Sequence, residues 1–169
     1  MAIERERKFL VKYIPDEATA YGSIKQQITQ GYLMLDYGQH LRVRVIDGEK
    51  SYIAFKKDVA PGVKYEFEYE IPVQDAIILL DESPYRVNKT RYTFKHNSLE
   101  IELDEYPDGL LIAEIEFKNI HPFTDFIKQL DNLPDYFDRD VTGVGKYSNV
   151  QISINNSGEV PKYPHNDSV

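Results

Sequence analysis

The sequence predicts a mainly β protein of the α+β class, built on eight antiparallel strands that each have one charged face and one apolar face. Two observations support this fold class. Charged and apolar residues alternate in segment after segment, and successive side chains of a β-strand point to opposite faces. Short turn signals such as Asp47-Gly48 and Pro61-Gly62 separate the segments, and hairpin turns make a sheet antiparallel.

The expected strands are, in order, residues 3–11, 26–35, 40–46, 51–57, 64–71, 86–95, 99–106 and 110–118. Residues 72–82, which open with a proline, and residues 122–131 have the apolar spacing of helices. Residues 17–23 are expected to form a short helix or a loop, and residues 140–149 a turn with one more helical stretch. We expect one folded domain at residues 1–154 and a disordered tail at residues 155–169, which contain little to bury.

The bulk composition excludes several classes of protein. The chain has 169 residues and a net charge of −8, so it can form one domain with a core, and no nonspecific binding to nucleic acid or to an anionic membrane is expected. It has no cysteine, hence no disulfide and no thiolate zinc site. The N-terminus lacks the apolar core of a signal peptide, and no apolar run approaches the ~20 residues that span a bilayer. We therefore expect a soluble, cytoplasmic protein.

The first strand concentrates charge on one face. Glu4, Glu6 and Lys8 alternate with Arg5 and Arg7, so the two carboxylates and the lysine share a side of the strand. Carboxylates two residues apart on a strand lie within about 7 Å of each other and repel unless a cation lies between them. That cation can be a divalent metal, or an Arg or Lys side chain from a neighbouring strand.

Most later strands carry a single sign of charge on one face. The basic residues are Arg42, Arg44, Lys56, Lys89 and Arg91, and the acidic ones are Glu66, Glu68, Glu70, Glu100, Glu102, Asp104, Glu114 and Glu116. An open sheet with one solvated face gives this alternation without any function. However, repeated like charges are unfavourable unless a neighbouring strand or a ligand opposes them.

A closed barrel is the second interpretation. Eight strands can close on themselves, and if the helices cover the apolar face outside, the charged face lines the interior. Such an interior stays wet or binds a ligand, because unpaired buried charge is very unfavourable. Its basic residues would converge as phosphate ligands and its carboxylates would hold hard divalent cations. A barrel with an apolar patch outside could also form a homodimer.

The motifs resemble, in order, those of the CYTH, or triphosphate tunnel metalloenzyme, superfamily. Residues 4–11 are similar to its ExExK signature followed by Phe-Leu-Val. The similarity continues at residues 30–33, 41–44, 55–56, 68–71, 89–92, 102–106, 113–117 and 146–149. It therefore extends over residues 2 to about 150.

This resemblance implies an eight-stranded antiparallel tunnel that acts on a triphosphate with Mg²⁺ or Mn²⁺. By matching position, the metal ligands are Glu4, Glu6, Asp104, Glu114 and Glu116. The substrate-binding residues are Lys8, Arg42, Arg44, Lys56, Lys89, Arg91 and Lys146, and Glu4, Glu6 and Lys8 are the catalytic set. Lys146 stands where the family often has arginine. Lysine keeps the positive charge but cannot donate two parallel hydrogen bonds as a guanidinium group does. Glu68 and Glu70 are candidates for activating the water.

Three functions are compatible with the resemblance. The first is hydrolysis of inorganic triphosphate or a small organic triphosphate, such as a nucleoside or thiamine triphosphate, by metal-activated water. The second is a class IV-type adenylate cyclase, which makes cyclic AMP and pyrophosphate from ATP. The third is a polyphosphate- or nucleotide-binding module without turnover. The histidines have no spacing typical of a metal site, and His40 and His96, beside turns, are expected to be ordinary surface residues.

Overall fold

The structure is a computed structural model, and it describes residues 2–36, 38–118 and 133–157. The strands are β1 (Ala2–Val11), β2 (Ile24–Asp36), β3 (Gln39–Ile46), β4 (Lys50–Ala60), β5 (Val63–Glu70), β6 (Tyr85–His96), β7 (Leu99–Glu105), β8 (Leu111–Glu116) and β9 (Phe137–Asp140). The helical elements are η1 (Asp16–Ala18), α1 (Val73–Glu82), η3 (Gly145–Tyr147) and α3 (Asn149–Ser157).

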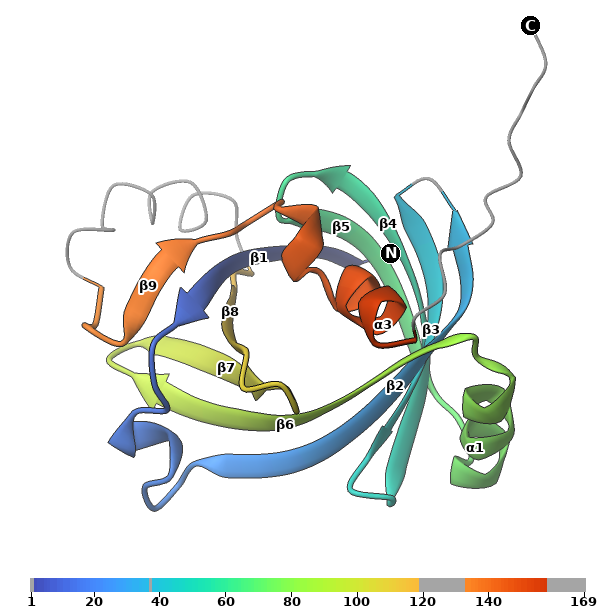
Figure 1. Cartoon of the computed structure of the whole chain (residues 1–169), viewed down its shortest axis with the longest axis horizontal. Helices are drawn as coiled ribbons and strands as arrows, with labels where there is room; N and C mark the ends of the chain where they lie inside the picture. Colours follow the sequence, from blue (N-terminus) through green and yellow to red (C-terminus); the bar gives the residue numbers. More distant parts are fainter. Residues whose placement is uncertain (1, 37, 119–132, 158–169) are drawn as a thin grey trace, which may run out of the picture.

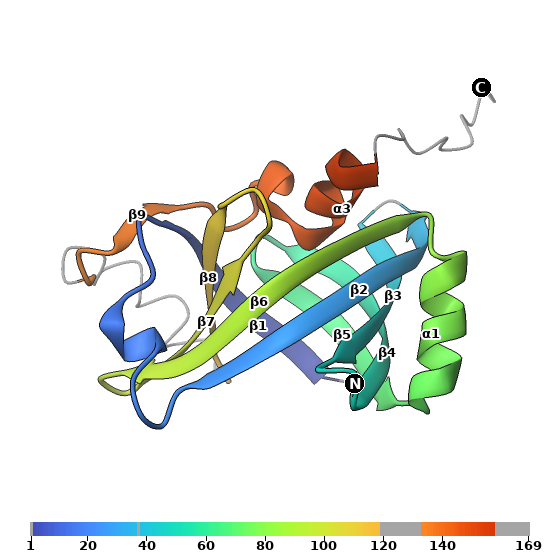
Figure 2. The same ribbon diagram turned by 60° about the horizontal axis from the view of Figure 1, so that its bottom comes forward.

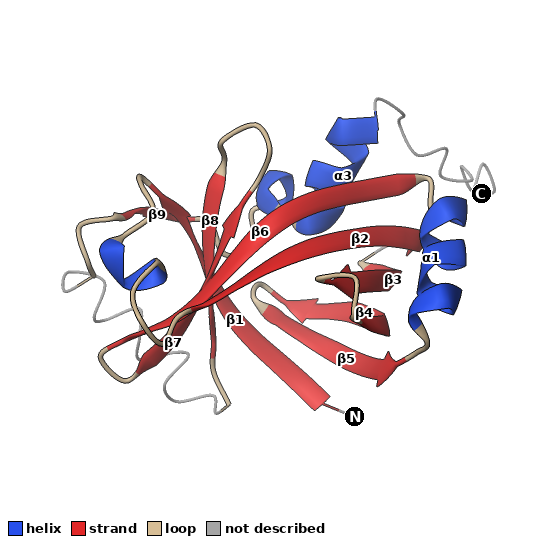
Figure 3. Cartoon of the chain, turned by 90° about the horizontal axis from the view of Figure 1, so that it is seen from below, coloured by secondary structure: helices blue, strands red, loops and turns tan. Residues whose placement is uncertain are grey.

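Eight of the strands close into an antiparallel barrel (Figure 1). Their order is β5-β4-β3-β2-β6-β7-β8-β1, and β1 pairs with β5 to complete the ring. Figure 3 shows β1 and β5 side by side. The strand β9 adds to the C-terminal half of β1. The predicted closed barrel is therefore confirmed.

The strand register places the charged residues on the inner face. Directly paired residues of antiparallel strands point to the same side of the sheet. Glu4 pairs with Lys64, Lys8 with Glu114, and Arg91 with Asp104. The same alternation carries these side chains inward on every strand, so the apolar faces point outward and must be covered there.

Helix α1 covers part of this apolar outer face. Pro72 precedes its first turn, and Ala76 and Leu80 pack on Val43 and Val45 of β3. The approach of α1 to β2 is close: a Cβ added to Gly31 would lie 2.5 Å from Ser83 Oγ, at the end of the helix. The position of α1 agrees with the expectation of helices packed outside the barrel.

Helix α3 is placed differently, across one end of the barrel (Figures 1 and 2). Its Ile152 packs with Val87, Tyr106 and Ile112. These three residues share the inward phase of their strands, so α3 closes the barrel interior with apolar contacts. The expectation that the helices pack outside the barrel is therefore wrong for α3.

The expected elements match the observed ones with small differences at their ends. All eight predicted strands are present. Strand β2 begins two residues earlier than expected, β4 ends three residues later, and β6 is one residue longer at each end. The predicted helix at 122–131 lies outside the described residues, as do residues 158–169 of the expected tail. Helix α3 includes residues 155–157, so the expectation of disorder fails for these three. Strand β9 was not expected. None of the described helices is long and apolar enough to cross a membrane.

Candidate active site

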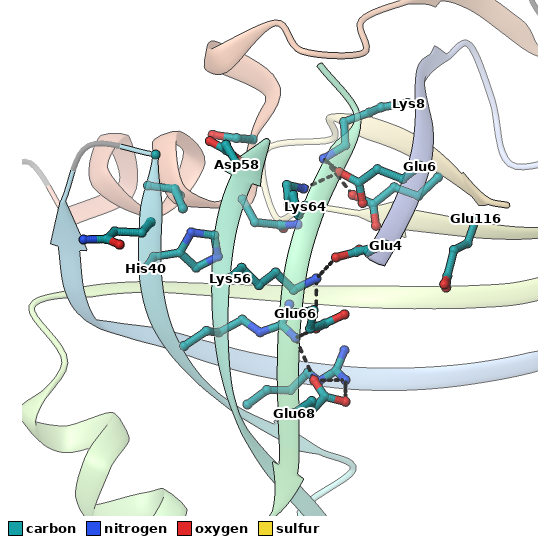
Figure 4. A pocket seen from close by; sticks show the side chains of 18 of the residues that line it. Glu4, Glu6, Lys8, His40, Lys56, Asp58, Lys64, Glu66, Glu68 and Glu116 are labelled. Atoms are coloured by element: carbon teal, nitrogen blue, oxygen red, sulfur yellow. Dashed lines mark hydrogen bonds and ion pairs between the residues drawn. The ribbon is translucent and has the colours of Figure 1, made fainter. Parts of the chain in front are cut away.

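The barrel encloses a cavity of about 720 Å³ with a strongly charged lining (Figure 4). Described residues line it with six lysine and arginine side chains and nine carboxylates. The basic ones are Lys8, Arg42, Arg44, Lys56, Lys64 and Arg91; the acidic ones are Glu4, Glu6, Asp36, Asp58, Glu66, Glu68, Glu102, Glu114 and Glu116. Because carboxylates outnumber the lysines and arginines, the lining as a whole attracts cations.

The two carboxylates of β1 are each held by a lysine from β4 or β5. Lys56 Nζ donates to Glu4 Oε2 at 2.7 Å and lies 3.1 Å from Glu66 Oε1. Lys64 Nζ donates to Glu6 Oε1 at 2.5 Å. In this structure, each carboxylate is neutralised by its own lysine, from the neighbouring strand β5 for Glu6 and from the next strand, β4, for Glu4.

Lys8 joins β1 to β8. Its Nζ lies 2.7 Å from Glu114 Oε1 and 3.8 Å from Glu6 Oε1. Burial alone would lower the pKa of Lys8, but Glu114 and Glu6 outweigh it and raise the pKa above its ordinary value. The same pairing holds the pKa of Glu114 well below its ordinary value against the effect of burial. Both groups are therefore charged at neutral pH.

A second group of ion pairs lies on β6, β7 and β8. Arg91 donates from Nε and one terminal nitrogen to the two oxygens of Asp104, each at 2.7 Å, and it also bonds Glu102 and Glu114. Lys89 Nζ donates to Asp104 Oδ2 at 2.6 Å and to Asn149 Oδ1 at 3.2 Å. Burial, followed by the nearby Arg91, lowers the pKa of Lys89 to about 8.

The arginines of β3 reach β5 over the intervening strand β4, where Ala54 pairs with both Arg42 and Glu68. Arg42 and Arg44 both donate to Glu68, at 2.8 and 2.9 Å. Their guanidinium groups form a pair of donors suited to phosphate oxygens. Glu68 holds these two arginines, and Glu70 is exposed and does not belong to the lining.

Most expected site residues converge on this cavity, with three exceptions. Lys89 and Asp104 lie directly behind the lining: Asp104 contacts it through Arg91, and Lys89 through Asn149. Lys146 is exposed, and its Nζ lies 4.7 Å from the ring centre of Tyr147. The structure therefore does not bring Lys146 to the other predicted phosphate-binding residues.

His40 corrects an expectation. It is not an ordinary surface residue, because its side chain lines the cavity (Figure 4) and its ring makes an edge contact with Tyr32 at 5.3 Å. Burial, together with Arg42 and Lys56, lowers the pKa of His40 to about 3. The imidazole is therefore neutral at physiological pH.

Two further residues were missed by the sequence analysis. Lys64 is the first residue of the expected strand 64–71 and shares the inward phase of Glu66 and Glu68, but it was not among the expected site residues. Asn149 accepts hydrogen bonds from Lys89 and from the Tyr106 hydroxyl, the latter at 2.7 Å. Asn149 ends the matching segment 146–149, but the sequence gave it no partner, because its contacts with Lys89 and Tyr106 depend on the position of α3 across the barrel end.

The acidic residues offer the right donor atoms for a hard divalent cation, but they are engaged with lysines and arginines. Within the parts of the chain that the structure describes, no three Asp, Glu or His side chains are grouped to hold a metal ion. Glu4, Glu6 and Glu114 each bond a lysine instead. Cation binding at these carboxylates therefore requires an exchange of partners.

A closed antiparallel barrel with an ion-paired interior defines a small class of proteins, distinct from barrels filled with apolar side chains. Within that class, the model of the CYTH domain matches residues 2–133. The chain therefore belongs to the CYTH domain family.

Similar proteins agree with this assignment. The inorganic triphosphatase of Acetivibrio thermocellus is 34% identical in an alignment 163 residues long, which covers 92% of this chain and 96% of that protein. The crystal structure of the hypothetical protein NE1496 is 27% identical with a TM-score of 0.62, over 94% of this chain and 99% of that one. A putative adenylate cyclase from Vibrio parahaemolyticus has a TM-score of 0.56 over 81% of this chain and 93% of that one. Its 16% identity indicates the fold alone.

Proposed function

We propose that this protein is a metal-dependent triphosphatase that hydrolyses inorganic triphosphate. The observation that carries the proposal is the charged cavity, in which cations suited to phosphate and carboxylates suited to metal alternate around one enclosed space. The similarity to a protein named inorganic triphosphatase, over nearly the whole length of both chains, supports the same reaction.

The charge of the cavity argues for a divalent cation, with Mg²⁺ and Mn²⁺ as the expected ions. A triphosphate is a polyanion, and it would enter a lining in which carboxylates already outnumber Lys and Arg. Oxygen donors are the preferred ligands of both ions. Glu4, Glu6, Glu114 and Glu116 line the cavity and would hold the cation, whereas Asp104 is fully buried and would first have to exchange its bonds to Lys89 and Arg91.

The chain's own cations would bind and orient the triphosphate. Arg42 and Arg44 can each donate two hydrogen bonds to phosphate oxygens, and Lys8 and Lys56 act as point charges. Arg91 is fixed by Asp104 and presents its outer nitrogens towards Glu102 and Glu114 at the cavity wall. These groups would also stabilise the charge that develops on the phosphoryl oxygens during hydrolysis. A bound divalent cation adds charge neutralisation and lowers the pKa of water in the site.

The lining favours an inorganic substrate over a nucleotide. Among the described lining residues, Leu35 and Val150 have apolar side chains, and Gly38 has no side chain. An adenine ring needs a larger apolar or aromatic surface. The cyclase and the non-catalytic binder therefore remain as outcomes of the test. The cytoplasmic location and the homodimer remain predictions.

The substrate is tested by incubating the purified protein with tripolyphosphate, ATP or thiamine triphosphate, with Mg²⁺ or Mn²⁺. We expect orthophosphate release, fastest from tripolyphosphate, and none in EDTA. Cyclic AMP with pyrophosphate from ATP would instead identify a cyclase. Binding of the triphosphates without any product would identify a binding module.

A further inference from the structure

Lys64 lines the cavity beside Glu4 and Glu6, two of the expected metal ligands. It is the second residue of β5 and pairs in register with Glu4. Its ammonium donates to Glu6, the neighbouring carboxylate of β1, at 2.5 Å (Figure 4). Lys64 also lines a second cavity of about 420 Å³, between the β4–β5 turn and residues 141–148. Lys64 and Glu6 both line the two cavities, so open space lies on either side of their ion pair.

The partners of Lys64 differ from those of Lys56. Lys56 bonds Glu4 and also Glu66, so it keeps an acidic partner if Glu4 binds a cation. Among the described residues, the ion pair of Lys64 is with Glu6, an expected metal ligand. A cation bound to Glu6 would therefore remove the acidic partner of Lys64 and leave a lysine charge facing the cavity.

We propose that Lys64 is an exchange cation that couples the binding of metal and triphosphate. In the empty cavity it neutralises Glu6. When a divalent cation binds Glu6, Lys64 is released and binds a phosphate oxygen of the substrate. This inference rests on the proposed function, but it concerns the coupling of two binding events rather than turnover.

The coupling has a definite sign. In the empty protein, Lys64 competes with the metal for Glu6. When a triphosphate binds Lys64, this competition ends, and the metal binds Glu6 more tightly. By linkage, the metal must strengthen triphosphate binding by the same factor. Without metal, Lys64 remains with Glu6 and contributes little to triphosphate binding.

The test uses a binding cycle that needs no turnover. Mn²⁺ affinity is measured from the electron paramagnetic resonance signal of free Mn²⁺, with and without a nonhydrolysable imido analogue of tripolyphosphate. The proteins are the wild type, Lys64→Met, Lys64→Arg and the control Lys57→Met. Lys57 is exposed and pairs with Tyr65, so it points away from the cavity on the neighbouring strand.

Lys64→Met should bind Mn²⁺ alone about threefold to tenfold more tightly, because Glu6 loses a competing charge. The factor by which the analogue strengthens Mn²⁺ binding should fall about tenfold, the typical value of one charge-assisted hydrogen bond. Lys64→Arg should retain most of the coupling, and Lys57→Met should behave as wild type.

Unchanged Mn²⁺ affinity in Lys64→Met, or a coupling factor equal to that of wild type, would overturn the proposal. Thermal unfolding of each variant verifies that it is folded. Failure of the proposed function has a different signature, because the wild type would then release no phosphate from tripolyphosphate while the binding cycle could still be measured.

Discussion

His40 shows how the cavity controls the charge of a single residue. Its imidazole faces Arg42 on its own strand, Lys56 on β4 and Lys64 on β5, with Glu6 of β1 as the nearby acidic group. Burial and these cations keep the imidazole neutral. It therefore adds no positive charge to a lining that already contains six lysine and arginine side chains. The same environment makes the folded protein sensitive to acid.

Replacement of His40 by glutamine should stabilise the protein at acidic pH. The pKa of His40 is about 3 in the folded protein, against 6.5 for a free imidazole. Below pH 6.5 the unfolded state therefore binds a proton that the folded state does not, and the free energy of unfolding falls by up to about 1.4 kcal/mol per pH unit from this residue. The free energy of unfolding of His40→Gln minus that of the wild type should therefore be about 1–2 kcal/mol more positive at pH 5 than at pH 7.5.

Urea unfolding at both pH values measures this effect. His96→Gln is the control, because His96 lies outside the cavity lining, with its Nδ1 3.5 Å from Glu17. An equal stability difference between His40→Gln and wild type at the two pH values would show that His40 does not titrate as the structure indicates.

At the scale of elements, the position of α1 depends on a glycine in β2. An alanine at Gly31 would place its Cβ 2.5 Å from Ser83 Oγ, 2.6 Å from Ser83 Cβ and 3.1 Å from Leu80 Cδ2. Rotation of Ser83 can move its hydroxyl but not its Cβ. Helix α1 must therefore shift to accept any side chain at this position.

Gly31→Ala should lower the free energy of unfolding by about 1–3 kcal/mol, as overpacking typically does. Thermal and urea unfolding measure the loss. Gly145→Ala, where nothing lies within 4 Å of the added Cβ, should change stability far less. The double variant Gly31→Ala/Ser83→Gly should recover part of the loss, and a Gly31→Ala protein as stable as wild type would contradict the close packing of α1 on β2.

The elements also show where sequence reasoning succeeds and fails. Long alternating strands are predictable, because their period of two is repeated over many residues. Strand β9 has only four residues and three of them are charged, so it carries no such signal. Helix α3 is rich in Asn and Ser and resembles a tail; its Ile152 becomes a core residue because the open end of the barrel lies next to it.

At the scale of the whole molecule, barrel closure could not be deduced from alternation alone. An open sheet and a closed barrel have the same pattern, and the deciding contact is the pairing of β1 with β5, far apart in the sequence. The resemblance to a known family supplied the choice. The partners within the cavity were equally hidden, because the pairing of Lys64 with Glu6 depends on that closure.

The closed barrel also explains why so much charge is buried in a protein of net charge −8. Buried ion pairs seldom stabilise a fold more than apolar residues of similar size would. Their arrangement around an enclosed space is better explained by a charged ligand that exchanges with them. A metal and a triphosphate bound together, as proposed above, would meet that requirement, because each would replace one half of the existing pairs.

Phosphate release from tripolyphosphate by wild type, Glu4→Gln and Glu6→Gln, with Mn²⁺ present, tests this central claim most directly. The account predicts phosphate release by the wild type and a loss of at least about a hundredfold in each variant, because an amide is a much poorer cation ligand. Both variants should retain cooperative thermal unfolding. Glu17→Gln, at a residue of η1 that does not line the cavity, should retain full activity. No phosphate release by the wild type, or near-normal turnover in both variants, would contradict the account.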